Sequence, residues 1–95
     1  MNANATHYKN GQIISVVENG IMTYFFKDGT IKAKGPYHDQ VMDGEWTFYR
    51  ENGQLWQIGH FKNGLKHGTW IRYDKAMDME YDEVFWEGKI IKKKK

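Results

Sequence analysis

The chain has 95 residues and a net charge of +2, and it contains no cysteine, which excludes a disulfide framework and any thiolate metal site. Its first residues lack the basic and apolar regions of a secretory signal, and no apolar stretch approaches the ~20 residues that a membrane span needs. We therefore expect a single soluble domain located in the cytoplasm.

The first predicted element is a partial repeat near residues 8–19. It begins with Tyr8 and the turn pair Asn10-Gly11, and it resembles a later segment that begins with Tyr49 and contains Asn52-Gly53. Its spacing to the next unit is shorter than the spacing between later units, so the pattern leaves its register open. An atypical terminal unit is expected where a repeat array must be capped.

The units that follow repeat at an offset of 24 residues. Gly20, Gly44 and Gly68 coincide, and each is followed two residues later by a large apolar side chain. Self-similarity at such a period predicts a repeat architecture. Residues 1–91 are therefore predicted to form one domain, with full units at 20–43 and 44–67 and a degenerate unit at 68–91. The positions that define the repeat are Gly44, Trp46, Gly53, Gly59, Phe61, Gly64, Gly68 and Trp70.

Each unit predicts a β-hairpin. Asn-Gly and Asp-Gly between strand-forming residues are strong hairpin signals, because a type I′ turn needs positive φ at both central residues. A two-residue loop at Asn52-Gly53 would pair Trp46 with Gly59 and, one unit earlier, Met22 with Gly35. The absence of a Cβ at glycine would then let the indole of Trp46 lie over Gly59. A three-residue loop with a bulge is the alternative, and it would shift this register.

The fold class that follows is all-β, an antiparallel meander of consecutive β-hairpins that forms a single twisted repeat sheet. Alternation along the strands places Trp46, Phe48 and Phe61 on one face and Tyr49, Trp56 and Ile58 on the other. The first face is expected to form the core, and the second a shallow aromatic surface. Asn63-Gly64 is predicted to turn the chain toward Gly68.

The last unit departs from the pattern. Met77 stands where a turn glycine is expected, and Glu83 replaces the strand glycine. No convincing helix is predicted, although residues 74–82 are the best candidate for a single helical turn. A lysine tail follows at residues 92–95.

The pattern G-x-W-x-x-Y, followed by N-G and then by G-x-F-x-N-G-x-x-H-G, resembles MORN-type repeats over residues 20–88. More specifically, it is similar to the bacterial MORN-like variant found in the YwqK-type antitoxin family. The resemblance implies a β-hairpin repeat sheet without catalytic machinery or cofactors. It also implies a role as a scaffold, a membrane-associated platform or a partner-binding module, and an antitoxin-like partnership with another protein is one form of that role.

The residues capable of chemistry do not form a recognisable site. His7, His38, His60 and His67 show no ligand spacing, Ser15 is the only serine and stands in no nucleophile elbow, and the acidic residues after Asp74 lack the glycine of a calcium loop. His67 occupies the repeat position of Asp43, which favours a polar role at a turn. We therefore predict no enzyme, no metal site and no cofactor.

Binding is the better hypothesis, because exposed aromatic patches often mark interaction sites. The candidate aromatic surface consists of Tyr24, Tyr49, Trp56, His60 and Tyr73. The alternative is that a second layer, a dimer mate or the stems of lysine and arginine cover these rings. A protein partner is expected, and a specific nucleic-acid site is not.

Two further contacts are predicted. The run Lys92, Lys93, Lys94 and Lys95 offers weak binding to anionic lipid or polyanions. A weak homodimer through edge strands is also expected, because acidic residues such as Glu80 and Glu87 guard the C-terminal edge, whereas residues 13–17 carry little charge.

Overall fold

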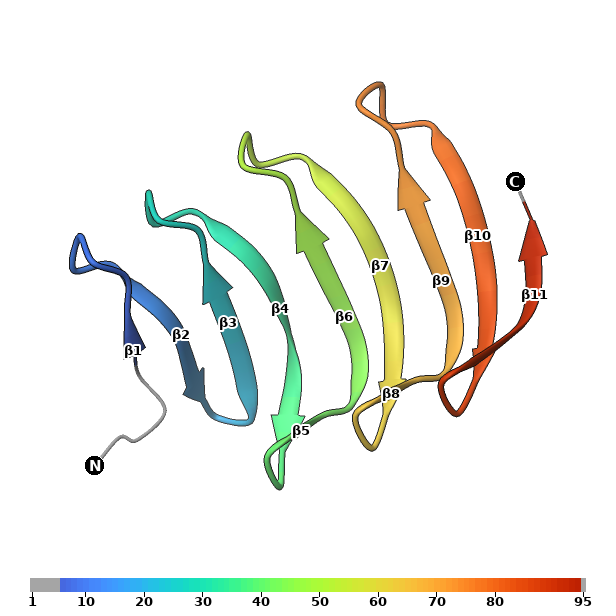
Figure 1. The fold of residues 1–95 in the computed structure, drawn as a ribbon, viewed down its shortest axis with the longest axis horizontal. Helices are drawn as coiled ribbons and strands as arrows, with labels where there is room; N and C mark the ends of the chain where they lie inside the picture. Colours follow the sequence, from blue (N-terminus) through green and yellow to red (C-terminus); the bar gives the residue numbers. More distant parts are fainter. Residues whose placement is uncertain (1–5, 95) are drawn as a thin grey trace.

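The computed structural model describes the backbone of residues 6–94 and all of their side chains except those of Tyr81 and Lys94. Its strands form one open antiparallel sheet of consecutive hairpins, which confirms the predicted all-β meander (Figure 1). In chain order the strands are β1 (Thr6–His7), β2 (Ile13–Glu18), β3 (Ile21–Phe25), β4 (Ile31–His38), β5 (Val41–Met42), β6 (Gly44–Tyr49), β7 (Leu55–Lys62), β8 (Leu65–Lys66), β9 (Gly68–Tyr73), β10 (Met79–Trp86) and β11 (Lys89–Lys94). The order across the sheet is β1-β2-β3-β4-β6-β7-β9-β10-β11, while β5 pairs with β4 and β8 with β7.

The loops along the upper edge in Figure 1 each contain three residues, so the predicted two-residue turn at Asn52-Gly53 is wrong. The N–H of Gly53 donates to the carbonyl of Arg50 at 2.9 Å, and the N–H of Arg50 donates to the carbonyl of Gln54 at 2.8 Å. This pattern is a type I turn that ends in a left-handed residue, here Gly53 at φ 92°. The same bonds recur in all four loops, at residues 9–11, 27–29, 51–53 and 75–77. We call these the upper loops.

The predicted register between the two strands of each hairpin is nevertheless correct, because a bulge follows each upper loop. Tyr49 pairs with Leu55, but its neighbour Phe48 pairs with Gln57, so Trp56 is an extra residue on β7. That extra residue cancels the shift caused by the longer loop. Trp46 therefore faces Gly59 as predicted.

The two-residue turns lie along the opposite edge, and we call them the lower loops. They contain Asn19-Gly20, Asp39-Gln40, Asn63-Gly64 and Glu87-Gly88, and all eight residues have positive φ. This is the type I′ geometry that suits the twist of a hairpin. The prediction that Asn63-Gly64 turns the chain toward Gly68 is thus confirmed, because β8 pairs with β7 before the chain enters β9.

Each buried tryptophan lies over a glycine of the preceding repeat. A Cβ added at Gly35 would overlap the ring of Trp46, and one added at Gly59 would overlap the ring of Trp70. The prediction that Trp46 covers Gly59 is therefore wrong, although the two residues are paired. The indole N–H fixes the direction of the ring, since Trp46 donates to the carbonyl of Pro36 at 2.9 Å and Trp70 to that of His60 at 3.0 Å.

These rings form the core along one face of the sheet. The indole of Trp46 is fully buried, and Trp70 is 3% exposed. Phe61 contacts both indoles edge-on, with ring centroids 6.1 Å from Trp46 and 5.1 Å from Trp70. Since burying each aromatic contributes ~2–3 kcal/mol, the ring-over-glycine contacts link successive hairpins more strongly than backbone pairing alone.

Both ends of the sheet differ from the predictions. The single helical turn at residues 74–82 does not form, because residues 75–77 are an upper loop and β10 begins at Met79. The lysines expected as a tail continue β11 as far as Lys94, and Lys95 lies outside the described residues. The C-terminal edge strand is therefore basic β11, not the acidic strand before it, and β1 pairs with part of β2 at the other end.

Candidate functional site

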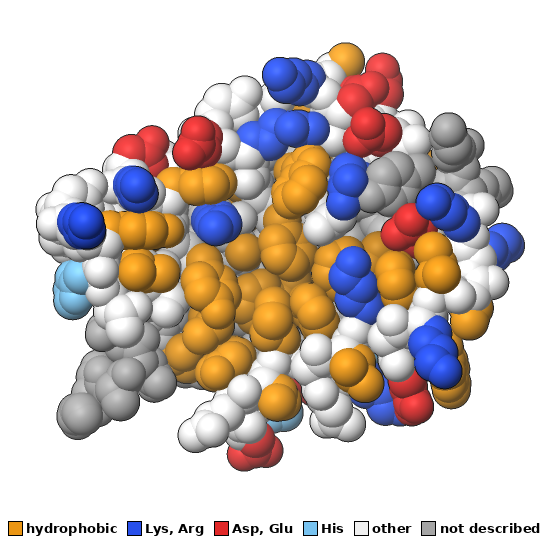
Figure 2. Space-filling view, in the orientation of Figure 1, with side chains coloured by type: hydrophobic (Ala, Val, Ile, Leu, Met, Phe, Trp, Pro, Cys, Tyr) orange, Lys and Arg blue, Asp and Glu red, His pale blue; other side chains and the backbone are white. Residues whose placement is uncertain are grey.

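The candidate site is an aromatic hollow on the core face, near the upper loops. It has a volume of about 350 Å³ and is open to solvent. Figure 2 shows hydrophobic side chains gathered over the middle strands, with cationic groups at their margin. The residues that line the hollow are Tyr24, Phe26, Lys32, Ala33, Phe48, Tyr49 and Trp56. We call this surface the aromatic hollow.

The bulge on β7 brings Trp56 to this face. Simple alternation placed Trp56 on the opposite face from Phe48, whereas both line the aromatic hollow. Tyr24 and Phe48 in turn contact Trp46, with ring centroids 6.3 Å and 6.2 Å away. The prediction of a separate aromatic surface on the face opposite Trp46 is therefore wrong for Tyr24 and Trp56. Trp56 is the extra residue of the bulge, which reverses the alternation at that point. Tyr24 lies two residues after Met22 on β3 and therefore shares the core face with it.

A small side chain at Ala33 accounts for the hollow. Its counterpart one repeat later is Gln57, and the counterpart of Phe48 is Arg72. There the Gln57 Oε1 accepts hydrogen bonds from Arg72 at 3.1 Å and 3.3 Å, and the guanidinium of Arg72 lies 4.9 Å from the ring of Trp56. These longer side chains occupy in the second repeat the space that Ala33 leaves open in the first.

The five predicted binding residues are only partly brought together. Tyr24, Tyr49 and Trp56 share the aromatic hollow. His60 does not line it, because it alternates with Gly59 to the other face, where its Nδ1 lies 3.4 Å from the carbonyl of Thr69. Tyr73 lies at the end of β9 and is absent from the lining.

Sequence reasoning missed four lining residues, Phe26, Lys32, Ala33 and Phe48, of which Phe48 was assigned to the core. Lys32 occupies the bulge position that Trp56 has in the next repeat, and its Nζ lies 5.8 Å from the ring centroid of Phe26. Aligning the bulge positions of successive units would have paired Lys32 with Trp56. The aromatic hollow therefore has an apolar floor and a cation at its rim.

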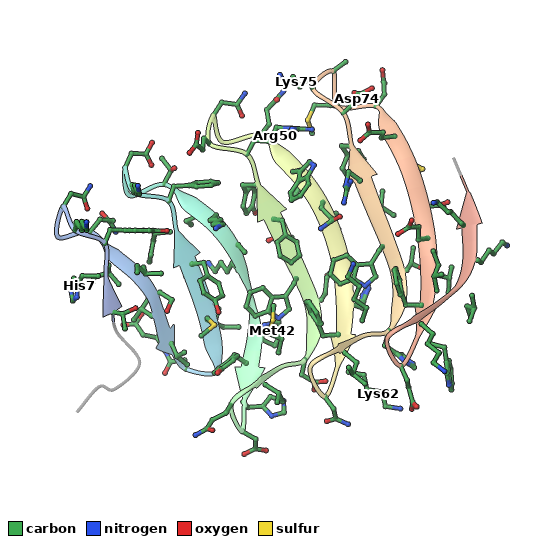
Figure 3. All side chains as sticks on the ribbon, viewed as in Figure 1. His7, Met42, Arg50, Lys62, Asp74 and Lys75 are labelled. Carbon is green, nitrogen blue, oxygen red and sulfur yellow. The ribbon has the colours of Figure 1, made fainter. Side chains whose placement is uncertain are left out.

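The upper loops are held together by polar contacts beside the hollow. Nη2 of Arg50 donates to the carbonyl of Tyr73 at 2.9 Å, and Figure 3 shows Arg50 at the same end of the sheet as Asp74 and Lys75. The buried Nε of Arg50 has no hydrogen-bond partner.

In the 27–29 loop, the Thr30 hydroxyl and N–H donate to the carboxylate of Asp28, and these bonds lower the pKa of Asp28.

The lower loops are also linked, through one side chain per repeat. Asp43 Oδ1 accepts the N–H of Asn63 at 3.2 Å, and one repeat later His67 Nδ1 accepts the N–H of Glu87 at 3.1 Å. The equivalence of Asp43 and His67, inferred from the alignment, is confirmed, as is a polar role for His67 at a turn. We call these two contacts the loop staples.

The described part of the chain contains no cluster of side chains that could bind a metal ion. No group of three or more histidine, aspartate or glutamate side chains among residues 6–94 is placed to hold a metal ion. Over the same residues no helix has the length and apolarity that crossing a membrane requires. The aromatic hollow, in contrast, offers stacking surface and one cation, which suits binding.

Comparison with known proteins identifies the repeat. Residues 18–39 and 42–63 each match the family model described as MORN repeat variant. The first match covers the hairpin of β3 and β4 and the second covers the hairpin of β6 and β7, so the resemblance predicted from the sequence is confirmed for these two segments. No match to the chain was found among curated proteins or among solved structures.

Proposed function

We propose that this protein is a non-catalytic module that binds another protein through the aromatic hollow. The observation that carries the proposal is the open aromatic lining formed by Tyr24, Phe48 and Trp56 around Ala33. Tyrosine and tryptophan are common anchors of protein interfaces, since they supply large, rigid contact area. The two MORN-variant repeats support the proposal, because such repeats build binding surfaces and generally lack catalytic groups.

Filling the hollow should abolish binding while leaving the fold intact. Ala33→Gln introduces the side chain that the next repeat already carries at this position, and the space beside it can accept the longer chain. Trp56→Ala removes the largest ring of the lining. Lys34→Gln is the matched control, because Lys34 is exposed and neighbours Ala33 but is not part of the lining.

The test is affinity capture from the native cell with all four proteins, after circular dichroism has shown that each variant is folded. We expect one protein to be captured by the wild type and by Lys34→Gln, and to be lost with Ala33→Gln and Trp56→Ala. The proposal fails if no protein is enriched over the control or if all four capture the same protein equally.

A finer form of the proposal is that the partner is a toxic protein that this chain neutralises. Its support is the similarity of the repeats to the bacterial variant of the YwqK-type antitoxin family. Co-expression with the product of a neighbouring gene that arrests growth would test it. The wild type should restore growth and Ala33→Gln should not, whereas growth arrest that persists with the wild type would reject the antitoxin form alone.

A second candidate function is binding to an anionic membrane surface. The observation that favours it is the exposure of Lys92 and Lys93 on β11, where each lysine near such a surface contributes about 1 kcal/mol. Co-sedimentation with anionic liposomes at low and physiological salt is the measurement. Absence of binding by the wild type at both salt concentrations would reject this function, and equal binding by a protein with both lysines changed to glutamate would show that these lysines do not carry it.

A further inference from the structure

The outer edge of β11 is a second surface suited to binding, far from the aromatic hollow. β11 ends the sheet, and its inner side pairs with β10 from Trp86↔Lys89 to Asp82↔Lys94, with a register shift that leaves Ile91 as an extra residue (Figure 1). No strand among residues 6–94 pairs with its outer side. Such an edge presents unpaired backbone N–H and C=O groups, which can accept a further strand.

The side chains at this edge are basic and apolar. Lys92 and Lys93 are exposed, and so are the neighbouring isoleucines, with Ile90 46% and Ile91 63% exposed. Trp86, the last residue of the neighbouring strand β10, is 57% exposed. An apolar patch beside lysines therefore runs along a strand that has one free side.

Charge alternates across the last two strands. Glu83 on β10 pairs with Lys93 on β11. Because opposite charges on facing positions stabilise a sheet and like charges destabilise it, an added strand that carries carboxylates would continue the alternation.

A second copy of this chain does not meet that requirement. Pairing β11 with another β11 would place lysine against lysine, and β1 at the other end of the sheet supplies only Thr6 and His7. Neither residue carries a carboxylate. The charges thus disfavour self-association at this edge and favour an acidic segment of a different protein.

We infer that β11 binds an extended acidic peptide segment of a partner protein as an additional strand. Lys92 and Lys93 occupy successive positions and therefore opposite faces of the sheet, so the segment carries consecutive carboxylates rather than alternating ones. Ile90 and Ile91 require apolar residues at the adjoining positions of the segment. The backbone hydrogen bonds supply affinity, and the side chains supply the choice of partner.

Fluorescence anisotropy with a short labelled peptide, in which two valines adjoin a run of glutamates, tests this inference at physiological salt. A matched peptide carries N-methyl groups on alternate backbone nitrogens, which removes N–H donors and keeps every charge. Lys92→Glu with Lys93→Glu is the main variant, and Lys92→Gln with Lys93→Gln is a milder one in case the charge reversal disturbs β11. Lys9→Glu with Lys27→Glu, at exposed lysines of the first two upper loops, is the control.

We expect the Lys92 and Lys93 variants and the N-methylated peptide each to weaken binding by about tenfold or more. The control variant and Trp56→Ala, which removes part of the aromatic hollow, should bind like the wild type. Hydrogen exchange should slow at the backbone amides of β11 when the peptide binds. The Trp56→Ala result separates this inference from the proposed function, because binding at β11 and binding at the aromatic hollow can each be absent without the other.

Three results would overturn the inference. If the wild type does not bind the peptide but does bind phosphatidylserine vesicles, β11 recognises lipid headgroups instead. If the N-methylated peptide binds equally well, the contact is one of charge alone and no strand is added. If the Lys92 and Lys93 variants bind as tightly as the wild type, β11 is not the site.

Discussion

At the scale of single residues, the upper loops show what glycine contributes. Gly11, Gly29 and Gly53 all have φ near 90° at the third loop position, and Met77 holds the same place at φ 69°. A residue with a Cβ is disfavoured in this left-handed region by ~1–2 kcal/mol. Met77 is 43% exposed, so little packing offsets that strain.

Met77→Gly should therefore stabilise the protein. The free energy gained by relieving the backbone strain exceeds the entropic cost of ordering a glycine on folding. The expected net increase in the free energy of unfolding is about 0.5 kcal/mol. Urea denaturation should show a higher midpoint with an unchanged slope. Met79→Gly is the matched control, because Met79 is also exposed but lies in β10 without positive φ, and it should lower the midpoint.

At the scale of elements, the loop staples join hairpins that the backbone ladder already connects. The N–H of Asn63 donates a hydrogen bond to the Asp43 carboxylate, and the N–H of Glu87 donates one to the His67 ring. Replacing one acceptor removes one hydrogen bond, which costs about 1 kcal/mol at a partly exposed site. The effect should be local, because each staple reaches only the next loop.

His67→Ala should speed hydrogen exchange at the Glu87 amide and leave the Asn63 amide unchanged. His67→Asp should restore slow exchange, because aspartate accepts the equivalent bond at position 43. NMR exchange measurements resolve the two amides. Equal acceleration at both sites would mean that the lower edge opens as one unit and that the staples are not separate.

Sequence reasoning reached the hairpins, their spacing and the pairing of Trp46 with Gly59, because these depend on local turn residues and on the repeat. It preferred the two-residue loop to the alternative of a three-residue loop with a bulge, because the extra residue is Lys32 in one unit and Trp56 in the next and the two share no residue type. That preference placed Trp56 on the wrong face. The position of the candidate site could not be predicted for the same reason. The small side chain of Ala33 leaves a hollow only because Trp56 and Phe48 lie on the same face of the sheet.

At the scale of the whole molecule, the ring-over-glycine contact joins the middle hairpins and is absent at both ends of the described sheet. At the N-terminal end Met22 stands in the place of a tryptophan, and it pairs with Val17 on β2. At the C-terminal end Glu83 takes the place of Gly59, and it faces Lys93. At this repeat position, a tryptophan thus occurs only where the preceding strand supplies a glycine.

This rule predicts a coupled pair at the N-terminal end. Met22→Trp alone should destabilise the protein by ~1–3 kcal/mol, because the Cβ of Val17 occupies space that the ring needs. Adding Val17→Gly should recover a large part of that loss. Chemical denaturation of the single and double variants gives the coupling energy, and additivity within about 0.5 kcal/mol would mean that Met22 does not follow the rule.

The central claim is that the indole of each repeat packs on the glycine of the repeat before it and so joins the hairpins into one sheet. A double-mutant cycle on Gly59 tests this most directly. Gly59→Val should cost ~1–3 kcal/mol or more in the wild type, because its Cβ would overlap the ring of Trp70. With Trp70→Leu present, the same change should cost much less, whereas with Trp46→Leu its cost should be unchanged. Relief by Trp46→Leu instead, or no relief by either, would contradict the account.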